Sequence, residues 1–387
     1  MRELVAVDLP GGPEFVDAVR RCWDRGDAVL PLPQRGPDEW RQAVVDALRP
    51  TRLLGADGTE TTLVGGEPVE DGDAVVVATS GTTGTPKGAV HTHQGLEHAA
   101  FATATALGAD PDVRWLACLP LDHVGGLSVV TRALVTGAGL EVHPGFDAAA
   151  VDDAAARGAT HVSLVPAVLE RIDAARWRTI LLGGSAVPSD RPSNSVATYG
   201  MTETFGGVVY DGLPLNGTAV RIAEEGRAED GSGPIELRTR SLLRCYRDGT
   251  DPVATDGWYR TGDLGWVEPG TGKLHVDGRA DDLVITGGEK VWPHPVETVL
   301  AAHPAVAEVV VVGRPDPVWG QTVTAVVVPA GEPPTLEALR SLVLDHLPPA
   351  AAPRALELVT ELPRTSLGKV RRHRAGHAHE RPADTAD

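Results

Sequence analysis

Lysine, cysteine and long apolar runs are scarce in this sequence. Only four of its 387 residues are lysine, so almost all of its 35 basic side chains are arginine. Its three cysteines, Cys22, Cys118 and Cys245, are scattered and odd in number, which predicts neither a disulfide framework nor a metal site. We therefore expect free thiols in the reducing cytoplasm.

The apolar runs are too short to cross a membrane. Two of the strongest, 74–78 and 309–312, fall far below the ~18 residues that a membrane span requires. No basic region precedes a long apolar stretch at the amino terminus, so we expect no secretory signal. The 53 acidic and 35 basic residues give a net charge of −18, which disfavours non-specific binding to nucleic acid. Local positive groups must therefore hold any anionic ligand.

Glycine, proline and alternating structure signals are abundant. The 44 glycines and 31 prolines have no collagen-like period, and they predict many turns in a globular chain of roughly two or three domains. Strand and helix signals alternate from residue 73, which predicts an α/β domain with a largely parallel sheet. The expected strands are 73–78, 115–119, 139–143, 160–165, 179–182 and 196–198. The expected helices begin at His93 or lie near 126–136, 147–157 and 166–175.

The ends of the chain differ from this central stretch. Residues 1–70 carry apolar positions at helical spacing and predict short helical pieces, whereas 207–277 predict a small β-rich portion. After a junction at 278–290, a compact α+β unit is expected. Its elements are a helix near 295–302, strands at 307–313 and 322–329, a helix at 335–347 and a strand at 356–360. We therefore expect a large domain over 1–278 and a small, mobile C-terminal domain over 279–387.

The segment ATSGTTGTPKGAVHTH, 78–93, is the strongest chemical motif. Its glycines let backbone N–H groups approach an anion, its hydroxyls add donors, and Lys87 adds a full charge. This composition predicts a phosphate-binding loop. It is not a Walker A loop, because Pro86 and Gly88 flank the lysine where that pattern needs glycine and a hydroxyl residue. The candidate residues are Thr79, Ser80, Gly81, Thr82, Thr83, Gly84 and Lys87.

Further motifs follow along the chain. LPLDHVGGL contains His123, and LLGGSAVP contains Gly183, Gly184 and Ser185. Taken alone, each is most simply a structural feature, since a lone histidine or a Gly-Gly-Ser turn is common. ATYGMTET brings together an aromatic ring, a glycine, a hydroxyl and a carboxylate in Tyr199, Gly200, Thr202 and Glu203. WYRTGDLG and LPRTSLGKVRR complete the set.

Together these segments resemble the acyl-adenylate-forming superfamily of acyl-CoA synthetases, peptide-synthetase adenylation domains and luciferases. The loop resembles its [ST]SGTTGxPKG signature, and the other segments stand in the expected order over most of the chain. The resemblance implies that a carboxylate attacks the α-phosphorus of ATP and that the thiol of CoA then attacks the acyl-adenylate. It also implies Mg²⁺, a small-molecule carboxylic acid as substrate, and CoA as co-substrate.

The resemblance also implies a role for each motif residue. Lys87 and its loop hold phosphates, and His123 lies at the wall of the acyl pocket. The turn at 183–185 passes beside the adenine. Tyr199 stacks on the adenine, and Thr202 bonds the α-phosphate. The carboxylate of Glu203 ligates Mg²⁺, which prefers oxygen ligands.

The remaining implied residues lie towards the carboxyl terminus. Asp263 accepts bonds from the ribose, and Arg279 supports the ribose or phosphate. Asp281 matches the hinge between domains. Gly287 and Gly288 line the pantetheine tunnel after rotation, when the catalytic Lys369 leaves the site.

The sequence determines the identity of the acid substrate less well than the type of reaction. The short segment before Thr79 resembles the compact o-succinylbenzoate–CoA ligases of menaquinone biosynthesis. The alternatives are a ligase for another aryl or short-chain acid, a stand-alone amino-acid adenylation enzyme, and a non-enzymatic CoA- or nucleotide-binding regulator. The last needs neither Glu203 nor Lys369. Arg132 is a candidate for holding a second carboxylate, although a surface or packing arginine is the simpler interpretation. The oligomeric state stays open, a homodimer included.

Overall fold

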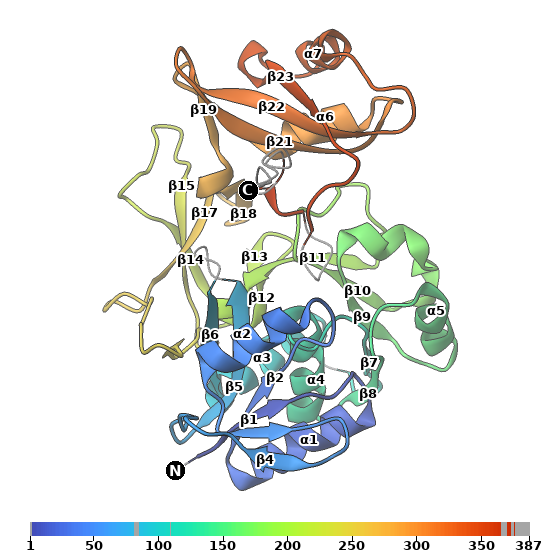
Figure 1. Cartoon of the computed structure of the whole chain (residues 1–387), viewed down its shortest axis with the longest axis vertical. Helices are drawn as coiled ribbons and strands as arrows, with labels where there is room; N and C mark the ends of the chain where they lie inside the picture. Colours follow the sequence, from blue (N-terminus) through green and yellow to red (C-terminus); the bar gives the residue numbers. More distant parts are fainter. Residues whose placement is uncertain (1, 81–84, 109, 365–369, 373–374, 376–387) are drawn as a thin grey trace, which may run out of the picture. The chain divides into compact units, whose positions relative to one another are not determined.

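The computed structural model of the chain, drawn in Figure 1, describes residues 2–80, 85–108, 110–364, 370–372 and 375. The chain forms two compact units. The first comprises Met1–Arg221, Glu236–Thr261 and Val267–His275. The second comprises Ile222–Ile235, Gly262–Trp266 and Val276–Asp387. The domain boundary expected at 278 stays a prediction.

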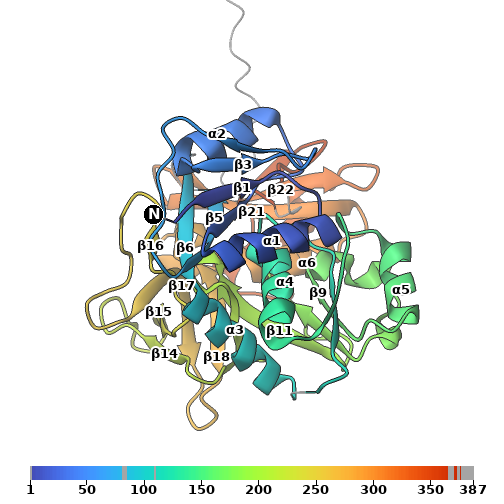
Figure 2. The same cartoon turned by 90° about the horizontal axis from the view of Figure 1, so that it is seen from below.

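The first sheet has seven strands in the order β16-β6-β5-β2-β1-β3-β4. Its strands are β1 (Leu4–Val7), β2 (Ala28–Pro31), β3 (Arg52–Leu54), β4 (Glu60–Thr62), β5 (Asp73–Ser80), β6 (Pro86–Thr92) and β16 (Cys245–Tyr246). Helices α1 (Pro13–Arg25) and α2 (Asp38–Leu48) lie on opposite faces of this sheet, as Figure 2 shows. A sheet covered on both faces explains why its central strands read as continuous apolar runs.

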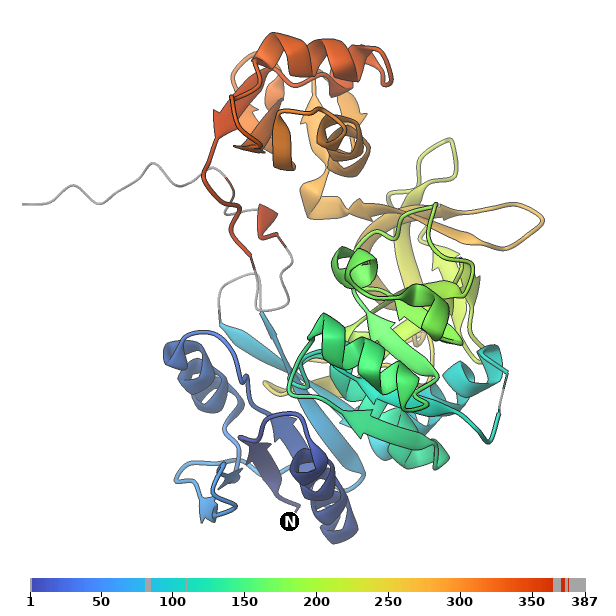
Figure 3. The same ribbon diagram turned by 90° about the vertical axis from the view of Figure 1, so that its right-hand side faces the viewer.

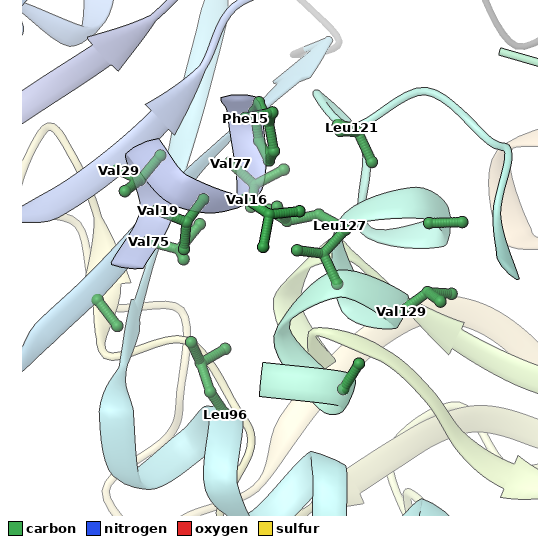
Figure 4. Close-up of a cluster of buried hydrophobic side chains, with 14 of the residues drawn as sticks. Phe15, Val16, Val19, Val29, Val75, Val77, Leu96, Leu121, Leu127 and Val129 are labelled. Carbon is green, nitrogen blue, oxygen red and sulfur yellow. The ribbon is translucent and has the colours of Figure 1, made fainter. Parts of the chain in front are cut away.

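Successive residues of the central strands enter different cores. Val75 and Val77 pack with Phe15 and Val19 of α1, as in Figure 4, whereas Val76 packs in the cluster that includes Leu48 of α2. This alternation is the two-residue period of a strand. It builds a rigid support beneath the point where β5 enters the glycine-rich loop.

The helical pieces expected within 1–70 are confirmed as α1 and α2, but strands β1 to β4 also lie there. The interpretation of this region as helical alone was therefore wrong. All four residues of β1 and of β2 are buried, and β3 and β4 have three residues each. Strands this short and this buried show no alternating pattern in the sequence.

The second sheet has the order β13-β12-β11-β10-β9-β7-β8, and its part from β11 to β8 is parallel. Its strands are β7 (Arg114–Ala117), β8 (Gly139–Val142), β9 (His161–Leu164), β10 (Thr179–Leu182), β11 (Ser195–Met201), β12 (Gly206–Tyr210) and β13 (Leu213–Pro214). The helices of this part are α3 (His93–Ala106), α4 (Val124–Thr136) and α5 (Ala148–Ala156). The α/β prediction is thus confirmed.

One expected helix does not form as a continuous helix. In place of a helix over 166–175, the chain forms 3₁₀ turns at Pro166–Arg171 and Ala174–Arg176. Between them Asp173 caps the second turn through the N–H of Ala175, and this local bond competes with a continuous helix. The β-rich portion is confirmed as a four-stranded sheet of β14 (Ala219–Ile222), β15 (Gly233–Arg238), β17 (Tyr259–Val267) and β18 (Leu274–Arg279).

The second unit contains the expected α+β structure. Strands β21 (Val306–Asp316) and β22 (Gly320–Pro329) form a long hairpin, and β23 (Ala355–Leu358) joins β22. Helices α6 (Pro293–Ala301) and α7 (Leu336–Leu344) pack beside each other on this sheet, as the orange and red helices in Figure 3 show. A short hairpin of β19 (Val284–Thr286) and β20 (Glu289–Val291) was not predicted. No helix among the described residues is long and apolar enough to cross a bilayer.

A buried ion pair anchors β5. The carboxylate of Asp73, 1% exposed, accepts bonds from Nε and Nη2 of Arg244 at 2.9 and 2.8 Å, and a third from the N–H of Glu70 at 3.0 Å. Arg244 is 33% exposed and keeps Glu70 as a second partner, so the loss is that of the charge-assisted bonds to Asp73, and we expect Asp73→Asn to lower the free energy of unfolding by about 2 kcal/mol.

Urea unfolding measures this loss. The control is Asp71→Asn, because the carboxylate of Asp71 is 84% exposed and its pair with Arg2 stabilises by less than about 1 kcal/mol. Equal losses in the two variants would contradict the assignment of Asp73 as a buried anchor.

Candidate active site

The phosphate motif forms the end of a β-hairpin. β5 and β6 are antiparallel, with Thr79 opposite Lys87 and Ser80 opposite Pro86. The hydroxyl of Thr79 donates to the carbonyl oxygen of Lys87 at 3.4 Å. Gly81, Thr82, Thr83 and Gly84 lie outside the described residues. The sequence predicted a loop from residue 86 to the helix, because proline and glycine there are typical of a turn. The structure instead forms strand β6 in this region.

Lys87 reaches from β6 to a residue that no motif indicated. Its Nζ lies 5.2 Å from the centroid of the Tyr246 ring, a cation–π contact. β16 places Tyr246 beside β6, with Tyr246 opposite Ala89. The hydroxyl of Tyr246 donates to Oε1 of Glu203 at 2.7 Å. Tyr246 thus contacts both Lys87, the predicted phosphate-binding lysine, and Glu203, the predicted metal ligand.

The scarcity of tyrosine was the one sequence signal that could have drawn attention to Tyr246. The chain has four tyrosines, and all of them lie between residues 199 and 259. Burial, followed by the bond to the Glu203 carboxylate, raises the pKa of Tyr246. The phenol therefore stays protonated and remains a donor to that carboxylate across physiological pH.

A tight hairpin holds Glu203. β11 leads into a single 3₁₀ turn, Thr202–Thr204, and the chain returns as β12. A Cβ on Gly200 would stand 1.9 Å from the carbonyl oxygen of Gly206, so only glycine allows this close approach. The hydroxyl of Thr204 donates to the carbonyl of Gly206 at 2.7 Å and accepts from the N–H of Met201. The backbone of Glu203 is therefore fixed while its carboxylate stays accessible.

The predicted adenine residues gather at the carboxyl ends of two parallel strands. Gly183 and Gly184 follow β10, and Tyr199 lies on the adjacent β11. A Cβ on Gly183 would stand 2.5 Å from the Thr198 hydroxyl, and Gly184 has a φ of +82°. Ser185 is exposed next to this turn. This edge of a parallel sheet is where α/β proteins bind ligands.

His123 stands at the amino end of α4. Its Nε2 lies 3.5 Å from the Asp122 carboxylate, and its side chain is 29% exposed. Arg132, farther along the same helix, is buried and stacks on Trp115 near the amino end of β7, at 4.5 Å. Burial lowers the pKa of Arg132. These contacts support the packing interpretation for Arg132.

A neutral histidine packs beside the turn that carries Glu203. His91 on β6 is fully buried and packs edge-on against Phe205, with ring centroids 4.9 Å apart. Burial lowers the pKa of His91 to about 4. Its ring is therefore uncharged at neutral pH and adds no charge to the phosphate-binding region.

The second unit carries the other predicted ligands. The Arg279 Nε lies 3.6 Å from the Asp263 carboxylate, and its guanidinium packs over Gly262, which has a φ of +77°. The structure therefore brings the predicted ribose pair together. Asp263 is 7% exposed, so its orientation is held by the surrounding protein.

The glycine pair of this unit forms a hairpin turn. Gly287 and Gly288, with φ of +59° and +85°, join β19 to β20 with Thr286 opposite Glu289. Two positive φ values are what a two-residue hairpin turn of this kind requires. Asp281 lies in the 3₁₀ turn Ala280–Asp282, and Lys369 lies outside the described residues.

Within the first unit, the structure thus brings Lys87 and Glu203 together through Tyr246. His123 lies at the start of α4, and the 183–185 turn follows β10. Among the described residues, no three His, Cys, Asp or Glu side chains gather as a metal site. Glu203 is a hard oxygen ligand that would share a Mg²⁺ with phosphate oxygens of a bound nucleotide.

Two family profiles match the chain. The profile described as AMP-binding enzyme matches residues 38–247. The profile described as AMP-binding enzyme C-terminal domain matches residues 295–369. Together they cover both the phosphate motif and the small domain.

Two curated proteins are similar over most of the chain. A probable 2-succinylbenzoate–CoA ligase of Mycobacterium tuberculosis is 41% identical over 336 residues, which cover 79% of this chain and 85% of that protein. An indoleacetate–CoA ligase of Aromatoleum aromaticum is 38% identical over 336 residues, which cover 77% of this chain and 66% of that protein.

Solved structures share the fold. The o-succinylbenzoate CoA synthetase of Bacillus subtilis, in complex with the acyl-adenylate intermediate, matches with a TM-score of 0.85 at 27% identity and covers 96% of this chain and 87% of that chain. The same synthetase with ATP and magnesium ion matches with a TM-score of 0.84 at 28% identity, covering 96% and 89%.

Tyr246→Phe tests the contact that the motifs missed. The variant keeps the ring under Lys87 but removes the hydrogen bond to the Glu203 carboxylate, and bonds to charged groups contribute about 1.5–3 kcal/mol. We expect ATP to bind about tenfold more weakly at limiting Mg²⁺, with unchanged binding in the absence of Mg²⁺. Calorimetric titration at several Mg²⁺ concentrations measures both.

The matched control is Tyr210→Phe. The Tyr210 hydroxyl is also buried and bonded, to Thr103 at 3.1 Å, and Tyr210 lies on β12, outside the phosphate motif. A loss of ATP binding that is the same with and without Mg²⁺ would contradict a role through Glu203.

Proposed function

We propose that this chain, which belongs to the AMP-binding enzyme family, converts 2-succinylbenzoate to its CoA thioester through an acyl-adenylate. Its family and relatives make it an AMP-forming acid–CoA ligase, and the acid is the part that we propose. The observation that carries the acid is the 41% identity to a probable 2-succinylbenzoate–CoA ligase over 85% of that protein. The reaction would belong to menaquinone biosynthesis.

The first half-reaction places negative charge on phosphate oxygens. Lys87 supplies a compact positive charge at the loop, and Thr202 supplies a hydroxyl donor. Glu203 would hold Mg²⁺, which when bound neutralises phosphate charge. Tyr246 donates to Oε1 of the same carboxylate and so restrains its orientation. The chain thus offers fixed positive groups where the transition state needs them.

The substrate carboxylate enters beside His123 in this proposal. His123 stands at the start of α4, where the positive end of the helix dipole favours an anion. Gly126 permits α4 to begin against the preceding strand end, because a Cβ there would stand 2.3 Å from the carbonyl oxygen of Leu119.

The second half-reaction requires an exchange of catalytic groups. We propose that residues 279–387 move as one domain about Asp281, and that Lys369 serves adenylation before Gly287 and Gly288 line the path of the CoA thiol. The two-glycine turn is narrow and carries no side chains, which suits a wall of a tunnel for an extended chain. Such closure also keeps water from a hydrolysable intermediate.

Alternative acids have support of their own. The 38% identity to an indoleacetate–CoA ligase favours a second candidate, a ligase for another aryl acid. No comparable observation favours an amino-acid adenylation enzyme or a non-enzymatic regulator. We place the reaction in the cytoplasm, which suits Cys22, Cys118 and Cys245 as free thiols.

Thioester formation with ATP, Mg²⁺ and CoA, followed by mass spectrometry, tests the acid. We expect selective formation of 2-succinylbenzoyl-CoA over CoA thioesters of indoleacetate, benzoates, fatty acids and amino acids. Turnover of another acid alone would retain the ligase and reject the proposed substrate. Absence of any thioester would reject the ligase assignment for the tested acids.

Lys369→Ala tests the two-step assignment. We expect adenylation, measured by ATP–pyrophosphate exchange, to fall by at least about 100-fold, because one positive group is lost from the phosphoryl transition state. Thioester formation from preformed acyl-adenylate should stay within about twofold of the parent. The control is Lys273→Ala, an exposed lysine in a turn, and equal loss of both half-reactions would refute the role of Lys369.

A further inference from the structure

An open cavity of about 720 Å³ lies within the first unit, apart from every motif residue considered above. Three arginines line it, Arg238 and Arg240 at the end of β15 and Arg244 before β16. Residues Gly217–Ala219 and Asp251 also line it. The cavity thus concentrates positive charge in a chain whose net charge is −18.

The three arginines are not equivalent. Arg244 is neutralised by Asp73 and by Glu70, whose carboxylate lies 2.8 Å from its Nη1. Arg238 stacks on the Trp258 ring at 4.8 Å, a contact that leaves the edge of its guanidinium available for hydrogen bonds. No carboxylate among the described residues pairs with Arg240 in the ion pairs of this structure. Arg238 and Arg240 therefore line the cavity as exposed arginines, and neither takes part in an ion pair among the described residues.

We propose that this cavity binds a phosphate monoester of a small hydroxylated molecule. Guanidinium edges match phosphate oxygens in paired hydrogen bonds, and Arg238 and Arg240 supply two such edges. Asp251 also lines the cavity, and a carboxylate accepts hydrogen bonds from carbon-bound hydroxyl groups, which an ester carries beside its phosphate and inorganic phosphate lacks. The volume is ample for a sugar phosphate with its water.

The cavity adjoins the active site without sharing its predicted ligands. Leu243 lines the cavity, and its N–H donates to the carbonyl oxygen of Glu203 at 2.7 Å. Arg244, the next residue, donates its N–H to Val90 of β6 at 2.8 Å. A ligand in the cavity therefore contacts the segment that supports Glu203 and β6. The site is a second binding site and does not depend on the acid proposed above.

Calorimetric titration of the full-length, nucleotide-free chain tests the site, with ribose 5-phosphate and glycerol 3-phosphate as probes. We expect at least one probe to bind more tightly than inorganic phosphate. The double variant Arg238→Gln/Arg240→Gln should weaken that binding at least tenfold. Arg21→Gln, which removes an exposed arginine of α1 outside the cavity, should leave it unchanged. Binding should persist with saturating ATP and Mg²⁺.

Several results would overturn the proposal. They are binding of neither probe, binding of inorganic phosphate as tight as that of both esters, displacement of the probes by ATP, and retained binding in the double variant. Ligase activity of the double variant at saturating substrates serves as the control for folding. Because the readout is binding of an ester that is no ligase substrate, failure here is distinguishable from failure of the proposed reaction.

Discussion

The buried ion pair between Asp73 and Arg244 connects parts of the chain that are 171 residues apart in sequence. Asp73 begins the strand that leads into the phosphate motif, and Arg244 precedes the edge strand β16. The pair holds β16 against β6 and so positions Tyr246 between Lys87 and Glu203. One charge interaction thereby helps to set the spacing of Lys87, Glu203 and Tyr246, which come from distant segments.

The sequence predicted what depends on local order and missed what depends on distant pairing. The chemistry of Lys87, Thr202 and Glu203 was recognisable because each lies in a contiguous motif. Tyr246 was not, since its importance arises only when β16 pairs with β6 across 156 intervening residues in the register of Tyr246 with Ala89. The short strands β1 to β4 were missed for a related reason, because their partners rather than their own patterns make them strands.

Within the second unit, the same distinction holds. Helices α6 and α7 were predicted from their apolar spacing, whereas the hairpin around Gly287 was not, because each of its strands has three residues. The pair of Asp263 and Arg279 was inferred from family resemblance, and the structure places the two side chains 3.6 Å apart within this unit. How the Asp263–Arg279 pair approaches the first unit depends on the proposed movement about Asp281.

The buried ring of His91 has a consequence for how this ligase responds to acidity. A histidine beneath a phosphate-binding hairpin would ordinarily gain a proton, and with it a charge, as a cell acidifies from pH 7 to 6. Here desolvation keeps the pKa of His91 near 4, so its ring stays neutral over that range. The turn that carries Glu203 therefore packs against a ring that adds no pH-dependent charge over the physiological range.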